Sequence, residues 1–153
     1  MKKYMVITLI TFCIVVAGLA QQSEQKGPSA QPRVRFAPLN IFLDSGNQGL
    51  AAFQFELKAV TGQIKIVGVE GGEHGVFKKP PYYDPAALAN DRIIIAAFST
   101  SHDLPTGLSQ IATIHLQIIG DTQPEYELDL IVAANADGEN IPAELTFEKG
   151  ELK

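Results

Sequence analysis

Residues 51–58 read AAFQFELK, and this octapeptide decides the fold class. Its apolar and polar side chains alternate strictly: Phe53, Phe55 and Leu57 against Gln54, Glu56 and Lys58. Successive side chains of a β-strand point to opposite faces, so the alternation predicts a strand with one buried and one solvated face. The 3.6-residue period of a helix would mix the two sets.

The same alternation recurs along the chain. It predicts strands at 112–118, 126–130 and 143–147, and apolar runs predict further strands at 39–43, 64–69 and 93–98. The last run, IIIAAF, is continuously apolar and predicts a central strand covered on both faces. Asp137-Gly138 is the strongest hairpin signal, and it is expected to join the strand ending near Ala133 to the one starting near Ile141.

Strands of this number, separated by short turns, predict an all-β antiparallel β-sandwich. The segment 84–90 is the one exception, because Asp84 can cap and Pro85 can begin one or two helical turns there. The hydrophobic content of 46% is enough for one buried core in a chain of 153 residues.

The first twenty residues have the features of a secretory signal peptide. Lys2 and Lys3 precede an apolar stretch, and Gly18-Leu19-Ala20 offers small residues for cleavage. The alternative is an uncleaved membrane anchor, because the uncharged segment 4–20 is close to the lower limit for a bilayer span. We expect signal peptide 1–20, a flexible leader 21–32 and a domain 33–153 that is secreted or periplasmic. The single cysteine, Cys13, lies in the signal segment, so no disulfide is expected in the domain.

Charge narrows the possible partners. The chain carries 12 basic and 17 acidic side chains, a formal charge of −5. A nucleic-acid partner is therefore not expected, because such proteins neutralise phosphates with basic patches. Contact with a membrane is expected only through the N-terminal segment, if that segment is not cleaved.

The order of segments resembles a cohesin-type domain. The resemblance rests on residues 51–57, the Ile-Val-rich strand that follows, the run 93–98, the strand 108–119 with IATI at 111–114, and NADGENI at 135–141 before Gly150-Glu151-Leu152. Cohesins share a superfamily with family 2 and family 3 carbohydrate-binding modules. The resemblance implies an exported bacterial module with jelly-roll (immunoglobulin-like) topology and about eight or nine strands. It also implies a protein partner, dockerin-like or another exported protein, or a polysaccharide.

One long loop concentrates unusual residues: 70–84 reads EGGEHGVFKKPPYYD. Pro80-Pro81 restricts the backbone before Tyr82 and Tyr83, and rigid tyrosines suit both sugar stacking and protein interfaces. The alternative is that one or both tyrosines cover an edge of the sandwich. The candidate ligand-binding residues are Phe77, Tyr82, Tyr83, Asp84 and Arg92.

Acidic residues form a second candidate surface. Glu127, Asp129, Glu144 and Glu148 occupy outward positions on two strands that the 137–138 hairpin is expected to join, so they are predicted to share one sheet face. Such a face either serves solubility and edge protection or docks a basic partner.

Three other groups of polar residues are interpreted as loop chemistry. Glu70, Glu73, His74 and Asp84 are suitable ligand types but match no metal motif. Asn135, Asp137 and Glu139 fit a hairpin turn better than a calcium loop. Ser99, Ser101, His102 and Asp103 lack a nucleophile elbow. We therefore expect no catalytic residue, metal or cofactor, and a non-catalytic binding module that mediates protein–protein assembly, with polysaccharide binding through Tyr82 and Tyr83 as the alternative.

Overall fold

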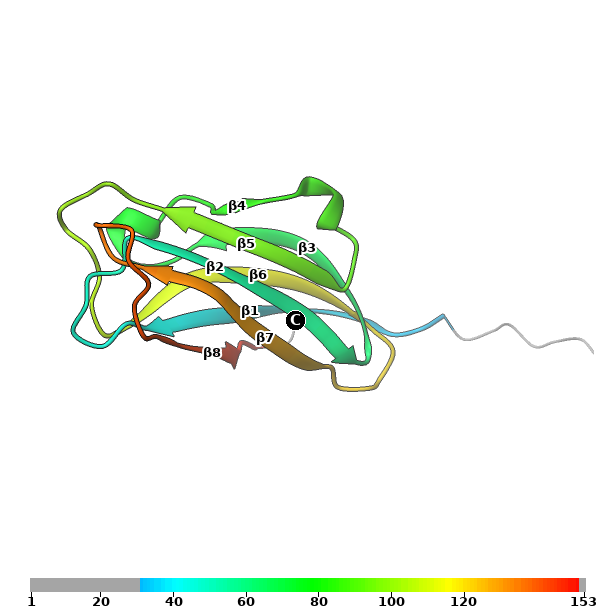
Figure 1. The fold of residues 1–153 in the computed structure, drawn as a ribbon. Helices are drawn as coiled ribbons and strands as arrows, with labels where there is room; N and C mark the ends of the chain where they lie inside the picture. The colour runs from blue at the N-terminus through cyan, green and yellow to red at the C-terminus, as the bar shows by residue number, and fades with distance from the viewer. Residues whose placement is uncertain (1–30, 152–153) are drawn as a thin grey trace, which may run out of the picture. The chain divides into compact units, whose positions relative to one another are not determined.

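The computed structural model describes residues 31–151, which form two antiparallel four-stranded sheets (Figure 1). Sheet A has the order β3-β6-β1-β8: β3 Gln63–Gly71, β6 Leu108–Ile119, β1 Val34–Asp44 and β8 Glu144–Lys149. Sheet B has the order β4-β5-β2-β7: β4 Tyr82–Tyr83, β5 Arg92–Phe98, β2 Ala52–Thr61 and β7 Glu125–Ala134. The predicted all-β antiparallel sandwich is confirmed, with eight strands.

The predicted signal peptide, the membrane-anchor alternative, Cys13 and most of the leader 21–32 lie outside the described residues. Within residues 31–151, no helix is long and apolar enough to cross a membrane. The chain contains two short 3₁₀ turns there, Gly75–Phe77 and Pro85–Ala87, and both belong to the connection between β3 and β5.

The core lies between the sheets and is built by the alternation seen in the sequence. Phe53, Phe55 and Leu57 of β2 are buried, and they meet the buried alternate residues of β1, among them Leu39 and Ile41. Each buried aliphatic or aromatic side chain of this kind stabilises the fold by about 1.5–3 kcal/mol. Because a shift by one residue would expose the whole set, the pattern also fixes the register of β2.

The prediction for residues 93–98 is wrong in one respect. These residues form β5, an inner strand of sheet B that pairs with β2 along its whole length and with β4 at Ile95 and Ala96. Ile93 and Ile95 are buried, whereas Ile94 and Phe98 are exposed on the outer face. The run is therefore an alternating strand whose solvent-facing positions are also apolar.

The Asp137-Gly138 turn forms as predicted, but the strands around it part. Gly138 has a φ of 78°, and a single bridge joins Ala134 to Asn140. Beyond that bridge β7 continues in sheet B and β8 in sheet A, so the expected two-stranded hairpin is not formed. The two strands instead form neighbouring edges of the two sheets.

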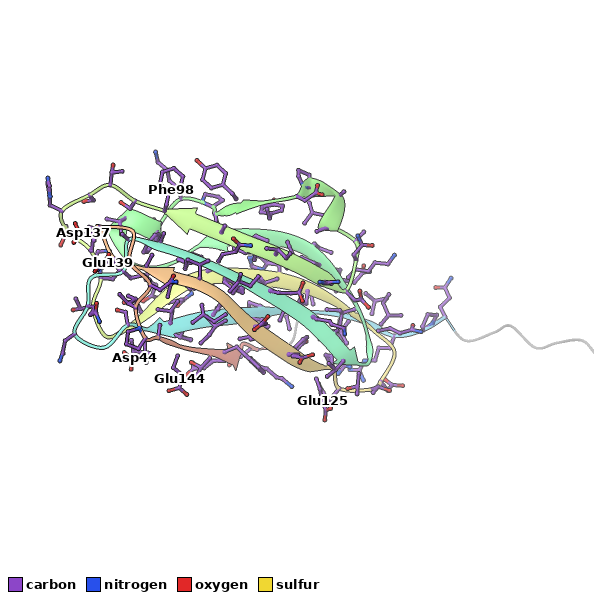
Figure 2. The ribbon with its side chains drawn as sticks, in the orientation of Figure 1. Asp44, Phe98, Glu125, Asp137, Glu139 and Glu144 are labelled. Carbon is purple, nitrogen blue, oxygen red and sulfur yellow. The ribbon has the colours of Figure 1, made fainter. Side chains whose placement is uncertain are left out.

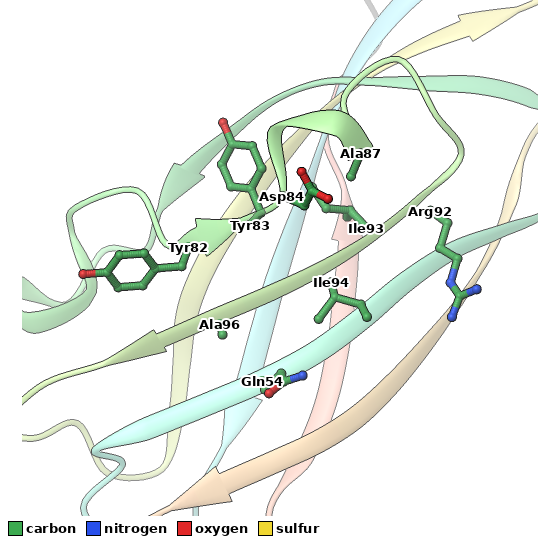
Figure 3. A pocket seen from close by; sticks show the side chains of 9 residues that line it. All are labelled: Gln54, Tyr82, Tyr83, Asp84, Ala87, Arg92, Ile93, Ile94 and Ala96. Carbon is green, nitrogen blue, oxygen red and sulfur yellow. The ribbon is translucent and has the colours of Figure 1, made fainter.

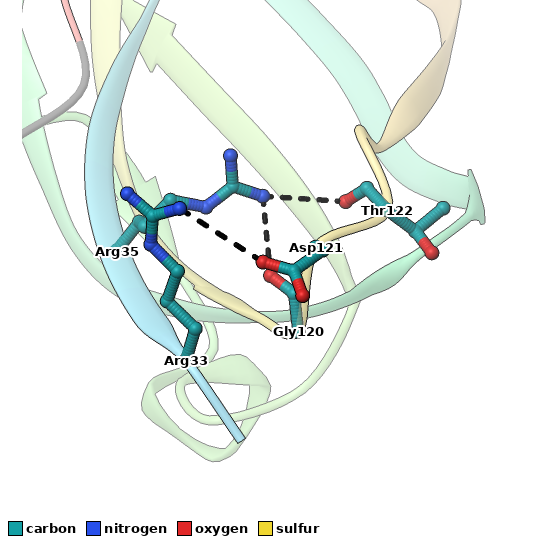
Figure 4. Close-up of polar contacts among 5 residues, drawn as sticks. All are labelled: Arg33, Arg35, Gly120, Asp121 and Thr122. Carbon is teal, nitrogen blue, oxygen red and sulfur yellow. Dashed lines mark hydrogen bonds and ion pairs between the residues drawn. The ribbon is translucent and has the colours of Figure 1, made fainter.

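The start of β1 is held against the turn between β6 and β7 (Figure 4). One guanidinium nitrogen of Arg35 donates to the carbonyls of Gly120 at 3.2 Å and Thr122 at 3.5 Å. Arg33 lies 4.0 Å from the Asp121 carboxylate, and both side chains are exposed. An exposed pair contributes at most about 1 kcal/mol, so this end is held mainly by the Arg35 contacts and by the Gly120 amide, which donates to the Arg33 carbonyl at 2.7 Å.

Candidate functional site

The outer face of sheet B carries the most distinctive surface of the described chain, and a tight loop positions its edge strand. The amide of Gly72 donates to the carbonyl of Phe77 at 2.8 Å, and the amide of Glu73 donates to Gln110 of β6 at 3.2 Å. A Cβ on Gly72 would lie 2.0 Å from the Gln110 carbonyl oxygen, so only glycine allows this approach. The loop therefore lies against β6 before it leads to β4.

Phe77 is part of the core, which corrects its prediction as a ligand-contacting residue. Its side chain is buried, and its ring packs edge-on against Phe53 with centroids 5.1 Å apart. A ring enclosed in this way has no face to offer a ligand. Phe77 instead anchors the loop, and so it indirectly positions Tyr82 and Tyr83.

The two tyrosines of β4 have different environments (Figure 3). Tyr83 pairs with Ile95 and packs against the core, while Tyr82 pairs with Ala96 and is 69% exposed on the outer face. Adjacent residues of a strand point to opposite faces, so one tyrosine covers the sandwich and the other faces solvent. The alternative that one tyrosine covers the sandwich therefore holds for Tyr83, while contact of the exposed Tyr82 with a ligand stays a prediction.

Phe98 completes the exposed surface, and the sequence analysis missed it. Its ring is 65% exposed and lies nearly parallel to that of Tyr82, at an interplanar angle of 11° with centroids 6.1 Å apart. Phe98 is labelled in Figure 2, and Ile94, labelled in Figure 3, is also exposed on the same face of β5. The signal in the sequence was the alternation of Ile94, Ala96 and Phe98, which is hidden in an all-apolar run. We call Tyr82, Phe98, Ile94 and Ala96 the aromatic strip.

A shallow groove of about 520 Å³ runs beside the aromatic strip (Figure 3). Register places Tyr82, Ala96 and Gln54 in one row across three strands. Because alanine is short, the row dips between the tyrosine ring and the Gln54 amide. The groove is lined by Gln54, Tyr82, Tyr83, Asp84, Ala87, Arg92, Ile93, Ile94 and Ala96.

Each charged residue of this groove has one polar atom engaged by a neighbouring residue. Arg92 donates through Nε to the Glu56 carboxylate, and the two form an ion pair on the sheet surface. One oxygen of Asp84 accepts from the Ala86 amide at 2.9 Å, which confirms Asp84 as the predicted cap of the Pro85–Ala87 turn. The exposed surface of the groove is therefore mainly aromatic and aliphatic, with the Gln54 amide as a polar neighbour.

The predicted acidic face does not exist as one sheet face. Glu127 and Asp129 lie on the outer side of sheet B, where they pair in register with Lys58 and Glu56. Glu144 lies on the outer side of sheet A, in register with Asp44. The hairpin inference failed because β7 and β8 separate into different sheets, so the acids line two edges that flank one side of the sandwich.

The remaining polar groups form turns. Oδ1 of Asn135 accepts from the amides of Asp137 and Glu139, and the hydroxyls of Ser99 and Ser101 accept from amides two residues on. His115 contacts Glu70, with 3.1 Å between Nε2 and Oε1, on the outer face of sheet A. Residues 31–151 contain no group of three or more His, Cys, Asp or Glu side chains placed to hold a metal ion.

Comparison with known proteins adds no relative to these observations. No protein-family model, no curated protein sequence and no solved structure matches the chain. The site is therefore interpreted from its own geometry.

Proposed function

We propose that the chain is an exported, non-catalytic, cohesin-like binding module that mediates protein–protein assembly through the aromatic strip. The observation that carries the proposal is the exposed, stacked pair of Tyr82 and Phe98 beside Ile94. Rigid aromatic side chains lose little entropy on binding and dominate many protein interfaces. Large apolar side chains gathered on one sheet face are typical of an interaction surface.

The partnered charges favour a protein over a sugar. A sugar needs polar groups that are free to bond its hydroxyls, whereas Nε of Arg92 is engaged by Glu56 and one oxygen of Asp84 by its own turn. Tyr83, which would be the second stacking platform, is half-buried against the core. An interface centred on apolar anchors with few free polar groups resembles a protein hot spot.

The test is affinity capture with the protein as bait, against exported proteins of the organism that makes it. We expect the Tyr82→Ala/Phe98→Ala variant to bind the captured partner at least about 30-fold more weakly, since hot-spot aromatics contribute about 2 kcal/mol or more. Phe36→Ala is the matched control, because Phe36 is an exposed aromatic on the outer face of sheet A. Equal loss in both variants, or no loss in either, would contradict the proposal.

Polysaccharide binding is the second candidate, and one observation favours it. The rings of Tyr82 and Phe98 are within 11° of parallel, and Tyr82 lines the groove together with the Gln54 amide, an arrangement that offers a sugar both a flat surface and a hydrogen-bonding group. Retention on an insoluble polysaccharide, lost in both Gln54→Ala and Tyr82→Ala, would select this candidate over a protein partner.

A further inference from the structure

The edges of β7 and β8 form a second surface, on a different side of the sandwich from the aromatic strip. β7 ends sheet B and β8 ends sheet A, so within residues 31–151 each strand has a backbone edge without a neighbouring strand of its own sheet. Between these edges the core is incompletely covered. We call its half-buried residues the apolar seam: Tyr126, Leu128, Leu130, Leu145 and Phe147.

One end of the apolar seam is closed by side-chain contacts, and the rest of the seam is partly open to solvent. At the closed end the rings of Tyr126 and Phe147 pack at 89°, and Lys149 lies 5.4 Å from the Tyr126 ring centre. The Lys149 ammonium donates to the carbonyl of Pro124 at 3.0 Å, so it seals the sandwich at this point. Beyond it Leu128, Leu130 and Leu145 remain only partly buried.

Acidic side chains flank the seam. Glu125, Glu127 and Asp129 alternate with the seam residues of β7 and are exposed on the outer face of sheet B. Glu144 and Glu148 alternate with the seam residues of β8 and are exposed on the outer face of sheet A. Charged outward residues usually protect an edge strand from pairing.

The negative charge of these side chains determines which kind of strand can pair with β7. In an antiparallel pair of two β7 strands centred on Leu128, Glu127 of one copy would face Asp129 of the other, and like charges directly opposite are destabilising. Every register that overlaps residues 125–129 of the two copies and keeps the acids on one face opposes acid to acid. A second copy of this chain is therefore disfavoured, while a strand with Lys or Arg at the alternate positions is complementary.

We infer that β7 accepts an extended peptide segment of alternating apolar and basic residues as a further strand of sheet B. Its backbone pairs with the free edge of β7, its apolar side chains cover the seam, and its basic side chains lie beside Glu127 and Asp129. A segment of about five residues would pair along β7 from Tyr126 to Leu130, before the bulge at Ile131 interrupts the alternation. In this mode of recognition the backbone provides affinity and the alternate side chains provide specificity.

The test uses two sets of labelled nine-residue peptides in which Val, Ile or Leu alternates with Lys in one set and with Glu in the other. We expect the Lys peptides to bind the purified protein and to slow hydrogen–deuterium exchange of β7 backbone amides. Glu127→Lys/Asp129→Lys should weaken this binding roughly tenfold, because it reverses two flanking charges. Asp103→Lys is the control, since Asp103 is exposed in the loop after β5 and should leave the affinity within about twofold.

Three results would overturn the inference. The first is equal or stronger binding of the Glu peptides, and the second is binding of the Lys peptides without slower exchange in β7. The third is self-association of the protein alone that protects the β7 amides, which would make a second copy the occupant. Because the aromatic strip is a separate surface, Tyr82→Ala/Phe98→Ala should leave peptide affinity unchanged, and this variant separates the inference from the proposed function.

Discussion

Gly72→Ala should destabilise the protein strongly, although it adds a single methyl group. The added Cβ would lie 2.0 Å from the Gln110 carbonyl oxygen and 2.8 Å from the Ile111 Cα. Cβ contacts with backbone atoms essentially never fall below 3.0 Å, so the loop and β6 must separate by about 1 Å to relieve the clash. That movement would weaken two backbone hydrogen bonds, one between Gly72 and Phe77 and one between Glu73 and Gln110.

The magnitude follows from these contacts. Overpacking costs about 1–3 kcal/mol, and each weakened hydrogen bond costs about 1 kcal/mol, so we expect the free energy of unfolding to fall by about 3–5 kcal/mol. For a domain of this size the melting temperature should fall by about 10–20 °C. Thermal unfolding followed by circular dichroism and by tyrosine fluorescence measures the change, and the fluorescence is unobscured because the sequence contains no tryptophan.

Gly75→Ala is the matched control, three residues along the same loop. A Cβ on Gly75 would meet nothing within 4 Å, and its φ is not positive. This variant should therefore retain the parent stability or gain up to about 1 kcal/mol from the less flexible unfolded chain. A Gly72→Ala protein that melts within a few degrees of Gly75→Ala would refute the argument that close backbone approach requires glycine here.

Three further predictions concern single side chains. Phe77→Ala should lower the free energy of unfolding by about 3–5 kcal/mol, while Phe98→Ala at the exposed site should change it by less than about 0.5 kcal/mol, as measured by urea titration; similar losses in both would contradict the burial assignment. Burial raises the pKa of Tyr126 from its ordinary value of 10.0 to about 12, so the folded state holds this proton more tightly. The contribution of this shift to the free energy of unfolding is complete below pH 10 and is lost as the pH rises towards 12. Denaturation at a series of alkaline pH values would detect the loss, and Tyr126→Phe should abolish this pH dependence. Asp84→Ala should cost about 0.5–1 kcal/mol through loss of the cap, and Asp84→Asn should recover most of it in the same titration; equal loss in both variants would contradict the capping role.

The strands were the most predictable part of the fold. Alternation such as that of Phe53, Phe55 and Leu57 has a local cause, because each side chain direction follows from its neighbours along the strand. The Asp84 cap was predictable for the same reason, since its partner amide lies two residues away. Local rules of this kind need no knowledge of what the strand packs against.

The exposed site depended on tertiary structure that the sequence pattern does not contain. Ile94 and Phe98 are apolar on a solvent-facing side, so the period of two was hidden in the run 93–98. Phe77 could be assigned to the core only once the loop was seen to lie against β6. The separation of β7 from β8 after a correct turn likewise depends on which sheet each strand joins, and hydrophobic pattern alone does not specify that choice.

The position of β1 has a consequence for the order in which the chain folds. β1 is the first strand of the described chain, yet it lies between β6 and β8, which span residues 108–119 and 144–149. Strands so distant in sequence pair slowly, because closing the long intervening loop costs chain entropy before the contacts form. Sheet A is therefore complete only when β8 has paired with β1. A chain that lacks β8 leaves one edge of β1 unpaired beside the core, and such an edge favours aggregation.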